Sequence, residues 1–231
     1  MPQFTFRPAT IGDLETVHQI IARQNMVDYG EPRRSLDDLR ELWNSTGFSL
    51  ETDSLIAFAP NGEAAGFAEL LDKDDQYIYL TETHQSPELA AQLLAGTEEL
   101  AKAQRRSSTE PFVLYGRAVE GNRVVRQTFE RNGYSSTLSF LIMQTTLTEE
   151  PPAPQWADGI NIRAFVPGQD EQAVYRADEE AAEDKGYHAL LSFDDWAKRM
   201  SLNSELFDPG LWFLAYDGNE LAGVCLNFIA K

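Results

Sequence analysis

The feature that most constrains this chain is an internal repeat with an offset of 156 to 157 residues. Three blocks of the first half recur in the second half in the same order. Three blocks in one order at nearly one offset predict two copies of a single folding unit. The matching pairs are 4–7 (FTFR) with 160–163 (INIR), 35–39 (SLDDL) with 192–196 (SFDDW), and 55–58 (LIAF) with 212–215 (WFLA), the last pair followed by Gly-Phe at 66–67 and Gly-Val at 223–224.

An acidic, Pro-rich stretch, TEEPPAP at 148–154, separates the copies and is typical of a semi-rigid extended linker. We therefore expect a complete unit over 1–147, a linker over 148–155 and the N-terminal half of a second unit over 156–231. Because Lys231 corresponds to position 74 of the first copy, we expect either a fragment of a longer protein or a natural truncation. The usual size of domains favours the fragment, of a protein of roughly 300 residues.

The charge balance excludes several classes of partner. Lys and Arg total 19 against 37 for Asp and Glu, a formal net charge of −18, whereas nucleic-acid binding depends on cations that neutralise phosphates. DNA, RNA and anionic membranes are therefore unexpected partners.

The N-terminus has no signal-peptide pattern and no apolar stretch is long enough to span a bilayer, so we expect a cytoplasmic protein. The only cysteine, Cys225, excludes an intrachain disulfide and is expected to be a buried strand residue.

Hydrophobic periodicity and turn signals predict the elements of the first copy. Clustered strands followed by strand–helix–strand crossovers imply an α+β fold, an α/β mixed sheet covered by helices. The expected order is a strand at 4–7, helices from 14 and from 35, strands at 54–59, 64–71 and 76–81, a helix at 87–106, a strand at 112–117, a helix at 122–132 and a last strand at 138–147.

This order resembles the GNAT superfamily of acetyl-CoA-dependent N-acetyltransferases. The stretch 6–10 (FRPAT) with Asp13 is similar to the family's opening strand and first helix, and 122–134 (NRVVRQTFERNGY) to its late helix ending in Gly-Phe or Gly-Tyr. The two-copy layout resembles tandem-domain members of the mycothiol synthase type. The resemblance covers nearly the whole chain and implies one complete GNAT copy plus the first half of a second, with acetyl-CoA as co-substrate and a small amine as acceptor.

The family binds the coenzyme A pyrophosphate on backbone N–H groups of a glycine-bearing loop at a helix N-terminus. The corresponding stretch here, 83–92, contains no glycine, and Pro87 lacks an N–H. An ordinary helix start with proline in its first turn is therefore favoured over a working pyrophosphate cradle. The resemblance implies cofactor contacts at Thr81, Thr83 and Asn122, although an Asn at a helix start is equally a cap.

An amine attacks a thioester only when neutral, so the reaction needs a base. Glu82 follows the strand at 76–81, where many GNAT enzymes place a carboxylate, and Glu69 is the alternative. A solvated surface group is the simpler interpretation of either. GNAT enzymes often use a Tyr in the late helix to protonate the leaving thiolate, but Phe129 stands there and cannot donate a proton. No pair of histidines has the spacing of metal ligands.

The second copy is the more acidic, with a net charge of −10 over 148–231 against −8 over 1–147. Its acidic positions 178–180 and 183–184 precede Tyr187 and His188. Two interpretations stay open: a solvated helix face, or an acidic rim that draws a cationic amine toward a second site.

Two functions follow. The first is an acetyl-CoA-dependent N-acetyltransferase of the tandem GNAT type, which acetylates an unidentified small amine and whose first domain is weakly active or inactive. The alternative is a non-catalytic binding module on the same scaffold. In that case the apolar edge strand expected at 221–229 is completed by a partner or by a second copy, as a homodimer.

Overall fold

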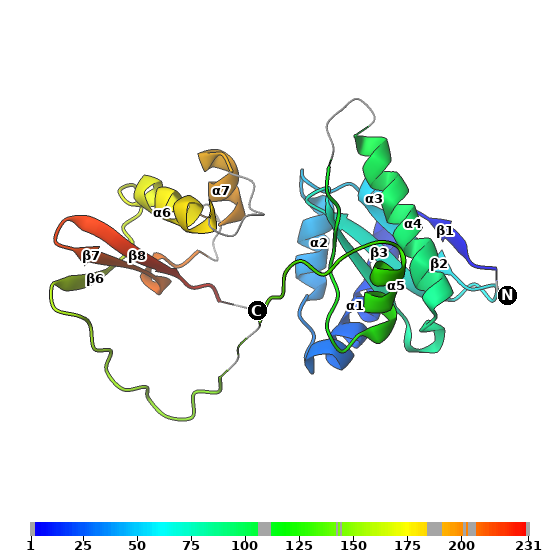
Figure 1. Cartoon of the computed structure of the whole chain (residues 1–231), viewed down its shortest axis with the longest axis horizontal. Coiled ribbons are helices and arrows are strands. Elements are labelled where there is room, and N and C mark those ends of the chain that lie inside the picture. Colours follow the sequence, from blue (N-terminus) through cyan, green and yellow to red (C-terminus); the bar gives the residue numbers. More distant parts are fainter. Residues whose placement is uncertain are drawn as a thin grey trace. The chain divides into compact units, whose positions relative to one another are not determined.

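The computed structural model describes residues 3–105, 112–141, 143, 145–183, 191–200, 202 and 207–229. The chain divides into two compact units, Met1–Ile142 (unit 1) and Met143–Lys231 (unit 2), which Figure 1 shows in colours that follow the sequence.

Unit 1 contains a five-stranded mixed sheet in the order β1-β2-β3-β4-β5, in which β4 and β5 are parallel and the other neighbours antiparallel. This confirms the expected mixed sheet. Its elements are β1 Thr5–Arg7, η1 Ile11–Asp13, α1 Leu14–Tyr29, α2 Leu36–Asn44, α3 Leu50–Asp53, β2 Ser54–Phe58, β3 Ala64–Leu71, β4 Asp75–Leu80, η2 Glu82–His84, α4 Pro87–Gln104, β5 Tyr115–Gly116 and α5 Arg123–Arg131.

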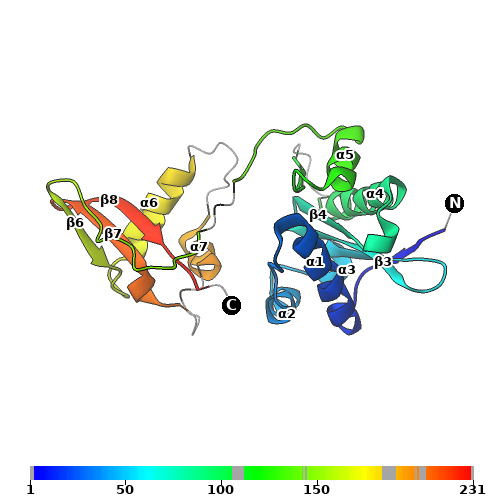
Figure 2. The same ribbon diagram turned by 90° about the horizontal axis from the view of Figure 1, so that it is seen from below.

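Helices cover both faces of this sheet. Figure 2 shows α1 and α2 on one face and α4 and α5 on the other. On the α1 side, Val17 and Ile21 of α1 and Leu39 of α2 pack against Ile56 and Phe67 of the sheet. A second buried cluster fills the α4 side, drawn from β2, β3, β4, α4 and α5. Two buried layers therefore fix the position of β4 between α1 and α4.

Two predicted strands of unit 1 differ in the structure. The strand expected at 112–117 is reduced to the two residues of β5. The strand expected at 138–147 is wrong: none of its described residues forms a strand, and Leu141 and Met143 are 88% and 91% exposed. A strand needs a neighbour for its backbone groups, and two residues of β5 leave no ladder for this segment to extend. The alternating pattern of apolar residues therefore produced a false strand signal.

Unit 2 contains a three-stranded antiparallel sheet in the order β6-β7-β8. Trp212 and Leu214 of this sheet are fully buried against Val174 and Trp196 of its two helices. Its elements are β6 Ile160–Ala164, α6 Glu171–Glu183, α7 Phe193–Arg199, η3 Pro209–Leu211, β7 Trp212–Asp217 and β8 Glu220–Leu226.

An equivalent bidentate ion pair joins the first strand of each unit to the segment that follows it. Arg7 donates to both carboxylate oxygens of Asp13 at 2.7 and 2.8 Å, and Arg163 donates to both oxygens of Asp170 at 2.6 and 2.7 Å. Ser35 likewise caps α2 as Ser192 caps α7. The repeated sequence blocks therefore build the same local structures.

The strand register corrects the expected offset between β2 and β7. Arg7 lies opposite Ile56 and Arg163 lies opposite Leu214, so Leu214, not Phe213, is the counterpart of Ile56, 158 residues further on. A shift of one residue exchanges the two faces of a strand. Leu214 is fully buried, as Ile56 is, whereas Phe213 is 42% exposed.

The acidic stretch of α6 is only partly a surface feature. The Asp178 carboxylate accepts a hydrogen bond from the Trp196 indole N–H at 2.9 Å, and Glu179, which is 6% exposed, accepts one from the Leu191 backbone N–H at 2.9 Å. These two residues hold the start of α7, and Glu180 and Glu183 face solvent. The positions 184, 187 and 188 that the sequence also singled out lie outside the described residues.

Two further expectations for unit 2 are wrong. The strand expected at 221–229 ends at Leu226, since β8 spans Glu220–Leu226. Cys225 lies in that strand but is exposed, because its side chain points away from the face that α6 and α7 cover. None of the helices among the described residues is long and apolar enough to cross a membrane.

Candidate functional site

The sheet of unit 1 opens between its two parallel strands. β4 and β5 pair only at Asp75 with Tyr115 and at Gln76 with Gly116, and the last bond between them joins the Arg117 N–H to the Gln76 carbonyl at 3.0 Å. Beyond this point β4 continues to Leu80 while the chain after Arg117 turns away toward α5. Among the described residues, no strand therefore lies beside the edge of β4 beyond Gln76.

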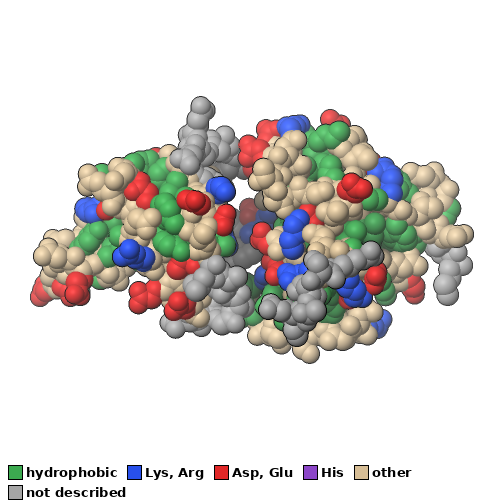
Figure 3. Space-filling view, turned by 90° about the horizontal axis from the view of Figure 1, so that it is seen from above, with side chains coloured by type: hydrophobic (Ala, Val, Ile, Leu, Met, Phe, Trp, Pro, Cys, Tyr) green, Lys and Arg blue, Asp and Glu red, His purple; other side chains and the backbone are tan. Residues whose placement is uncertain are grey.

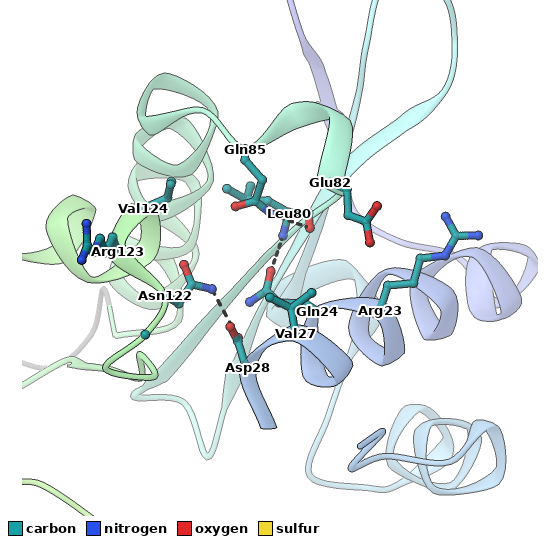
Figure 4. A pocket seen from close by; sticks show the side chains of 11 residues that line it. Arg23, Gln24, Val27, Asp28, Leu80, Glu82, Gln85, Asn122, Arg123 and Val124 are labelled. Carbon is teal, nitrogen blue, oxygen red and sulfur yellow. Dashed lines mark hydrogen bonds between the residues drawn. The ribbon is translucent and has the colours of Figure 1, made fainter. Parts of the chain in front are cut away.

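A cavity of about 370 Å³ lies at this opening. Its walls come from the second half of α1, the end of β4, the turn after β4 and the start of α5 (Figure 4). In Figure 4 the charged ends of Arg23 and Glu82 lie on one side of the cavity and Arg123 on the other. The lining residues are Arg23, Gln24, Val27, Asp28, Leu80, Glu82, Gln85, Gly121, Asn122, Arg123 and Val124.

Two of the four residues singled out from the sequence line this cavity. Glu82 lies in η2, directly after β4, and is exposed, and Asn122 lies at the start of α5. Thr81 and Thr83 are not among the lining residues. Their hydroxyls instead contact Nδ1 of His84 at 2.9 and 3.0 Å, and the Thr81 hydroxyl also donates to the Ala65 carbonyl at 3.1 Å.

The Asn122 side chain makes two hydrogen bonds at once. Its Oδ1 accepts from the Val125 N–H at 3.2 Å, which caps α5, and its Nδ2 donates to Oδ2 of Asp28 at 3.3 Å. Burial raises the pKa of the Asp28 carboxyl above its ordinary value, while hydrogen bonds from Asn122 and Gln24 lower it. A half-buried carboxyl group is thus held at the cavity wall.

Two glutamine side chains satisfy the open edge of β4. The Gln24 Nε2 donates to the Ile78 carbonyl at 3.2 Å, and the Leu80 N–H donates to Gln24 Oε1 at 2.7 Å. The Gln85 Nε2 donates to the Leu80 carbonyl at 3.2 Å. Three backbone groups that a neighbouring strand would pair are therefore bonded to side-chain amides.

The start of α4 has the form of an ordinary helix start. The Ser86 hydroxyl accepts from the Leu89 N–H at 3.1 Å, and Pro87 occupies the first turn. One of the few free N–H groups of this terminus is therefore already bonded, and another is absent. This geometry supports the interpretation that the loop is no glycine-based phosphate cradle.

Glu69, the alternative base, lies away from the cavity. It is fully buried, ion-paired with Arg34 at 2.7 Å, and accepts a hydrogen bond from the Tyr79 hydroxyl at 3.2 Å. Phe129 is 5% exposed and packs against Tyr134, with ring centroids 5.1 Å apart. These contacts give both side chains roles in the core of unit 1.

Sequence reasoning missed five polar residues that line the cavity: Arg23, Gln24, Asp28, Gln85 and Arg123. A signal for Gln24 was present. In α1 the buried positions Leu14, Val17, Ile20 and Ile21 recur at helical spacing, and Gln24 continues the same stripe. A polar residue on the buried stripe of a helix needs a hydrogen-bonding partner inside the protein.

Comparison with known proteins gives a consistent result. The mycothiol acetyltransferase of Catenulispora acidiphila is 32% identical over 93 residues, and that of Amycolatopsis mediterranei is 25% identical over 169 residues. These matches cover 40% and 70% of this chain but only 29% and 52% of the relatives, so the chain spans about half their length or less. No protein-family model matches the chain.

A solved structure matches nearly the whole chain. The GCN5-related N-acetyltransferase from Sphaerobacter thermophilus superposes with a TM-score of 0.78 at 28% identity, covering 98% of this chain and 72% of that one. The sheet that opens between two parallel strands, the acetyltransferase relatives and this structural match agree. The chain has the GNAT fold and is similar in sequence and structure to N-acetyltransferases of the GNAT superfamily.

Proposed function

We propose that the protein is an acetyl-CoA-dependent N-acetyltransferase that acts on a small amine, and that unit 1 contributes at most weak transfer. The observation that carries this proposal is the cavity where β4 and β5 diverge, which has Glu82 on one wall and Asn122 on another. It is large enough for an extended chain and brings a carboxylate to the opening. The acetyltransferase relatives support the reaction class.

In this proposal Glu82 takes the proton from the amine as the nitrogen attacks the thioester carbonyl. The carbon–sulfur bond then breaks, and coenzyme A leaves as a thiolate that water protonates. The exposure of Glu82 leaves the carboxylate accessible to an incoming amine. The weak activity of unit 1 has two supports: Phe129 cannot protonate a leaving thiolate, and Ser86 and Pro87 occupy the start of α4. A cytoplasmic location belongs to the same proposal.

The proposal is tested by calorimetric titration of the chain with acetyl-CoA and by acetyl transfer to a panel of small amines. We expect stoichiometric binding, and residual transfer that falls about 100-fold in Glu82→Gln while binding is unchanged. Glu88→Gln is the matched control, because Glu88 is also exposed, lies six residues away and does not line the cavity. Absence of both binding and transfer would overturn the proposal.

The alternative is a non-catalytic binding module on the same scaffold. The specific observation in its favour is that Gln24 and Gln85 already satisfy the edge of β4. On the face shown in Figure 3, acidic and basic side chains are scattered among apolar ones on both units. Binding of acetyl-CoA without transfer to any amine would favour this alternative, and sedimentation would test the homodimer that it includes.

A further inference from the structure

The open edge of β4 is satisfied from within the protein. A side-chain carboxamide offers one acceptor oxygen and two donor hydrogens in a plane, the groups that a peptide of a neighbouring strand would offer. Gln24 uses its oxygen for the Leu80 N–H and one hydrogen for the Ile78 carbonyl. It therefore replaces one peptide of a missing strand.

Gln24 is held in this position by its surroundings. It is 9% exposed, and it lies one helical turn before Asp28, whose carboxyl group Asn122 contacts. Gln85 is exposed and makes a single bond to the same edge. Gln24 is thus the stronger of the two contacts.

The cavity lies directly beside these contacts, since Gln24, Leu80 and Gln85 all line it. A ligand that extends along β4 would need the same Ile78 carbonyl and Leu80 N–H, because an extended chain binds a sheet edge through its main-chain or amide groups. Gln24 and such a ligand cannot hold these groups at the same time.

We propose that Gln24 is an intramolecular competitor for the edge of β4, and that its displacement opens unit 1 to an extended ligand that carries amide groups. The inference rests on the proposed function for the identity of that ligand, because the arm of coenzyme A carries two amides. Gln85 is a second, weaker competitor for the Leu80 carbonyl.

The competition has a defined effect on affinity. A ligand that displaces Gln24 exchanges existing hydrogen bonds for new ones and gains little at this edge. Without the Gln24 amide, the same ligand satisfies groups that are otherwise bonded only to water that enters the cavity. A net gain of one hydrogen bond corresponds to about tenfold in affinity.

The experiment compares binding of coenzyme A by calorimetry to the wild-type chain, to Gln24→Leu and to Asn25→Leu. Leucine has a volume close to that of glutamine and removes only the amide. Asn25 is the matched control, because it lies on the same helix and is 7% exposed but does not line the cavity. Exchange of the Leu80 amide hydrogen, followed by NMR, reports on the edge without a ligand.

We expect Gln24→Leu to bind coenzyme A about tenfold more tightly than the wild type, and Asn25→Leu to bind it as the wild type does. The Leu80 amide should exchange faster in Gln24→Leu and become protected again when coenzyme A binds. Gln85→Ala should raise the affinity for coenzyme A by a smaller factor. Because Gln85 is exposed, this variant should fold and provides the test if Gln24→Leu does not fold.

Equal affinities of the wild type and of both glutamine variants would overturn this inference and leave the proposed function intact. Absence of binding by every chain would overturn both, because no ligand would then use the edge. Unchanged exchange of the Leu80 amide in a folded Gln24→Leu variant would overturn the inference on its own.

Discussion

Asp28 and Asn122 lie 94 positions apart in the sequence and are joined side chain to side chain, with Nδ2 of Asn122 3.3 Å from Oδ2 of Asp28. Because Asn122 also caps α5, this contact ties the end of α1 to the start of α5 across the mouth of the cavity. Gln24, one turn earlier in α1, bonds to β4. Side-chain hydrogen bonds therefore join α1 both to α5 and to β4 beside the cavity.

Asn122→Ala should destabilise unit 1 by about 1–2 kcal/mol, because it removes the cap of α5 and the contact with Asp28 together. Asn122→Ser is the matched comparison, since serine caps a helix well but is too short to keep the second contact. Urea unfolding followed by NMR signals of α5 should place Asn122→Ser between the wild type and Asn122→Ala. Equal losses in the two variants would show that the cap contributes nothing here.

The raised pKa of Asp28 predicts a pH dependence with a defined sign. Because burial raises the pKa of Asp28 in the folded protein, the ionised carboxylate opposes folding. This unfavourable effect begins as the pH rises through the pKa of Asp28 in the unfolded chain, and it is complete above its pKa in the folded protein. Asp28→Asn should therefore gain stability relative to the wild type at pH 7 and lose that advantage below about pH 4.

Direct titration of the carboxyl carbon by NMR checks the same point. The midpoint of Asp28 should lie above the ordinary range of aspartate, and Asn122→Ala should raise it further, because the hydrogen bond from Asn122 lowers the pKa. A midpoint at or below the ordinary value would contradict the burial that the structure assigns to this side chain.

Arg7 and Asp13 give a prediction with an internal control. The Arg7 hydrogen bonds hold the pKa of Asp13 at about 2. The ion pair therefore stabilises unit 1 above the unfolded pKa of about 4, and this contribution is lost as the pH falls toward 2. Arg7→Gln should return the NMR midpoint of Asp13 toward the ordinary value. Arg163→Gln, which breaks the equivalent pair in unit 2, should leave Asp13 unchanged.

The sequence predicted the parts of the fold that depend on local pattern. The repeated blocks include Ser35 and Ser192, which cap α2 and α7, since a cap requires a particular side chain at a fixed spacing. The pairing of Arg7 with Asp13 and of Arg163 with Asp170 was not predicted. The hydrophobic pattern gave wrong predictions where contacts with distant segments decide whether a strand forms and in which register it pairs. The segment 138–147 alternates as a strand does, but none of its described residues pairs with a strand. The one-residue shift between β2 and β7 appears only in the ladder register.

The candidate site was predictable in part. Glu82 and Asn122 were singled out through the family resemblance, which places a carboxylate after this strand and an Asn at the start of the late helix, and both line the cavity. Gln24 and Asp28 belong to a helix whose face toward β4 cannot be derived from the order of elements. Their contacts join α1 to segments more than 50 residues away, and no local pattern reports such a contact.

Gly116 and Phe129 form a close contact that predicts a rescue. A Cβ atom at Gly116 would overlap the Phe129 ring, which is 5% exposed and has little room to move. Gly116→Ala should therefore destabilise unit 1 by about 1–3 kcal/mol. The double variant Gly116→Ala/Phe129→Leu should lose less than the sum of the two single losses in urea unfolding. Additive losses would mean that the two residues do not constrain each other.

The buried ion pair between Arg34 and Glu69 predicts a strong coupling. Glu69 is fully buried, and burial, with the nearby Glu69 charge, raises the pKa of Tyr79 well above its ordinary value, so the Tyr79 hydroxyl stays protonated and donates to Glu69. Arg34→Met would leave the carboxylate buried without its cation and should destabilise unit 1 by about 3–5 kcal/mol.

The double variant Arg34→Met/Glu69→Gln separates the ion pair from the packing around it. Glutamine keeps an acceptor for the Tyr79 hydroxyl but carries no charge, so no unpaired charge stays buried once Arg34 is replaced. We expect the double variant to recover more than half of the stability that Arg34→Met loses, measured by urea unfolding. If the double variant is as unstable as Arg34→Met, the instability of Arg34→Met comes from lost packing of the Arg34 side chain. The unpaired charge of Glu69 would then not be its cause.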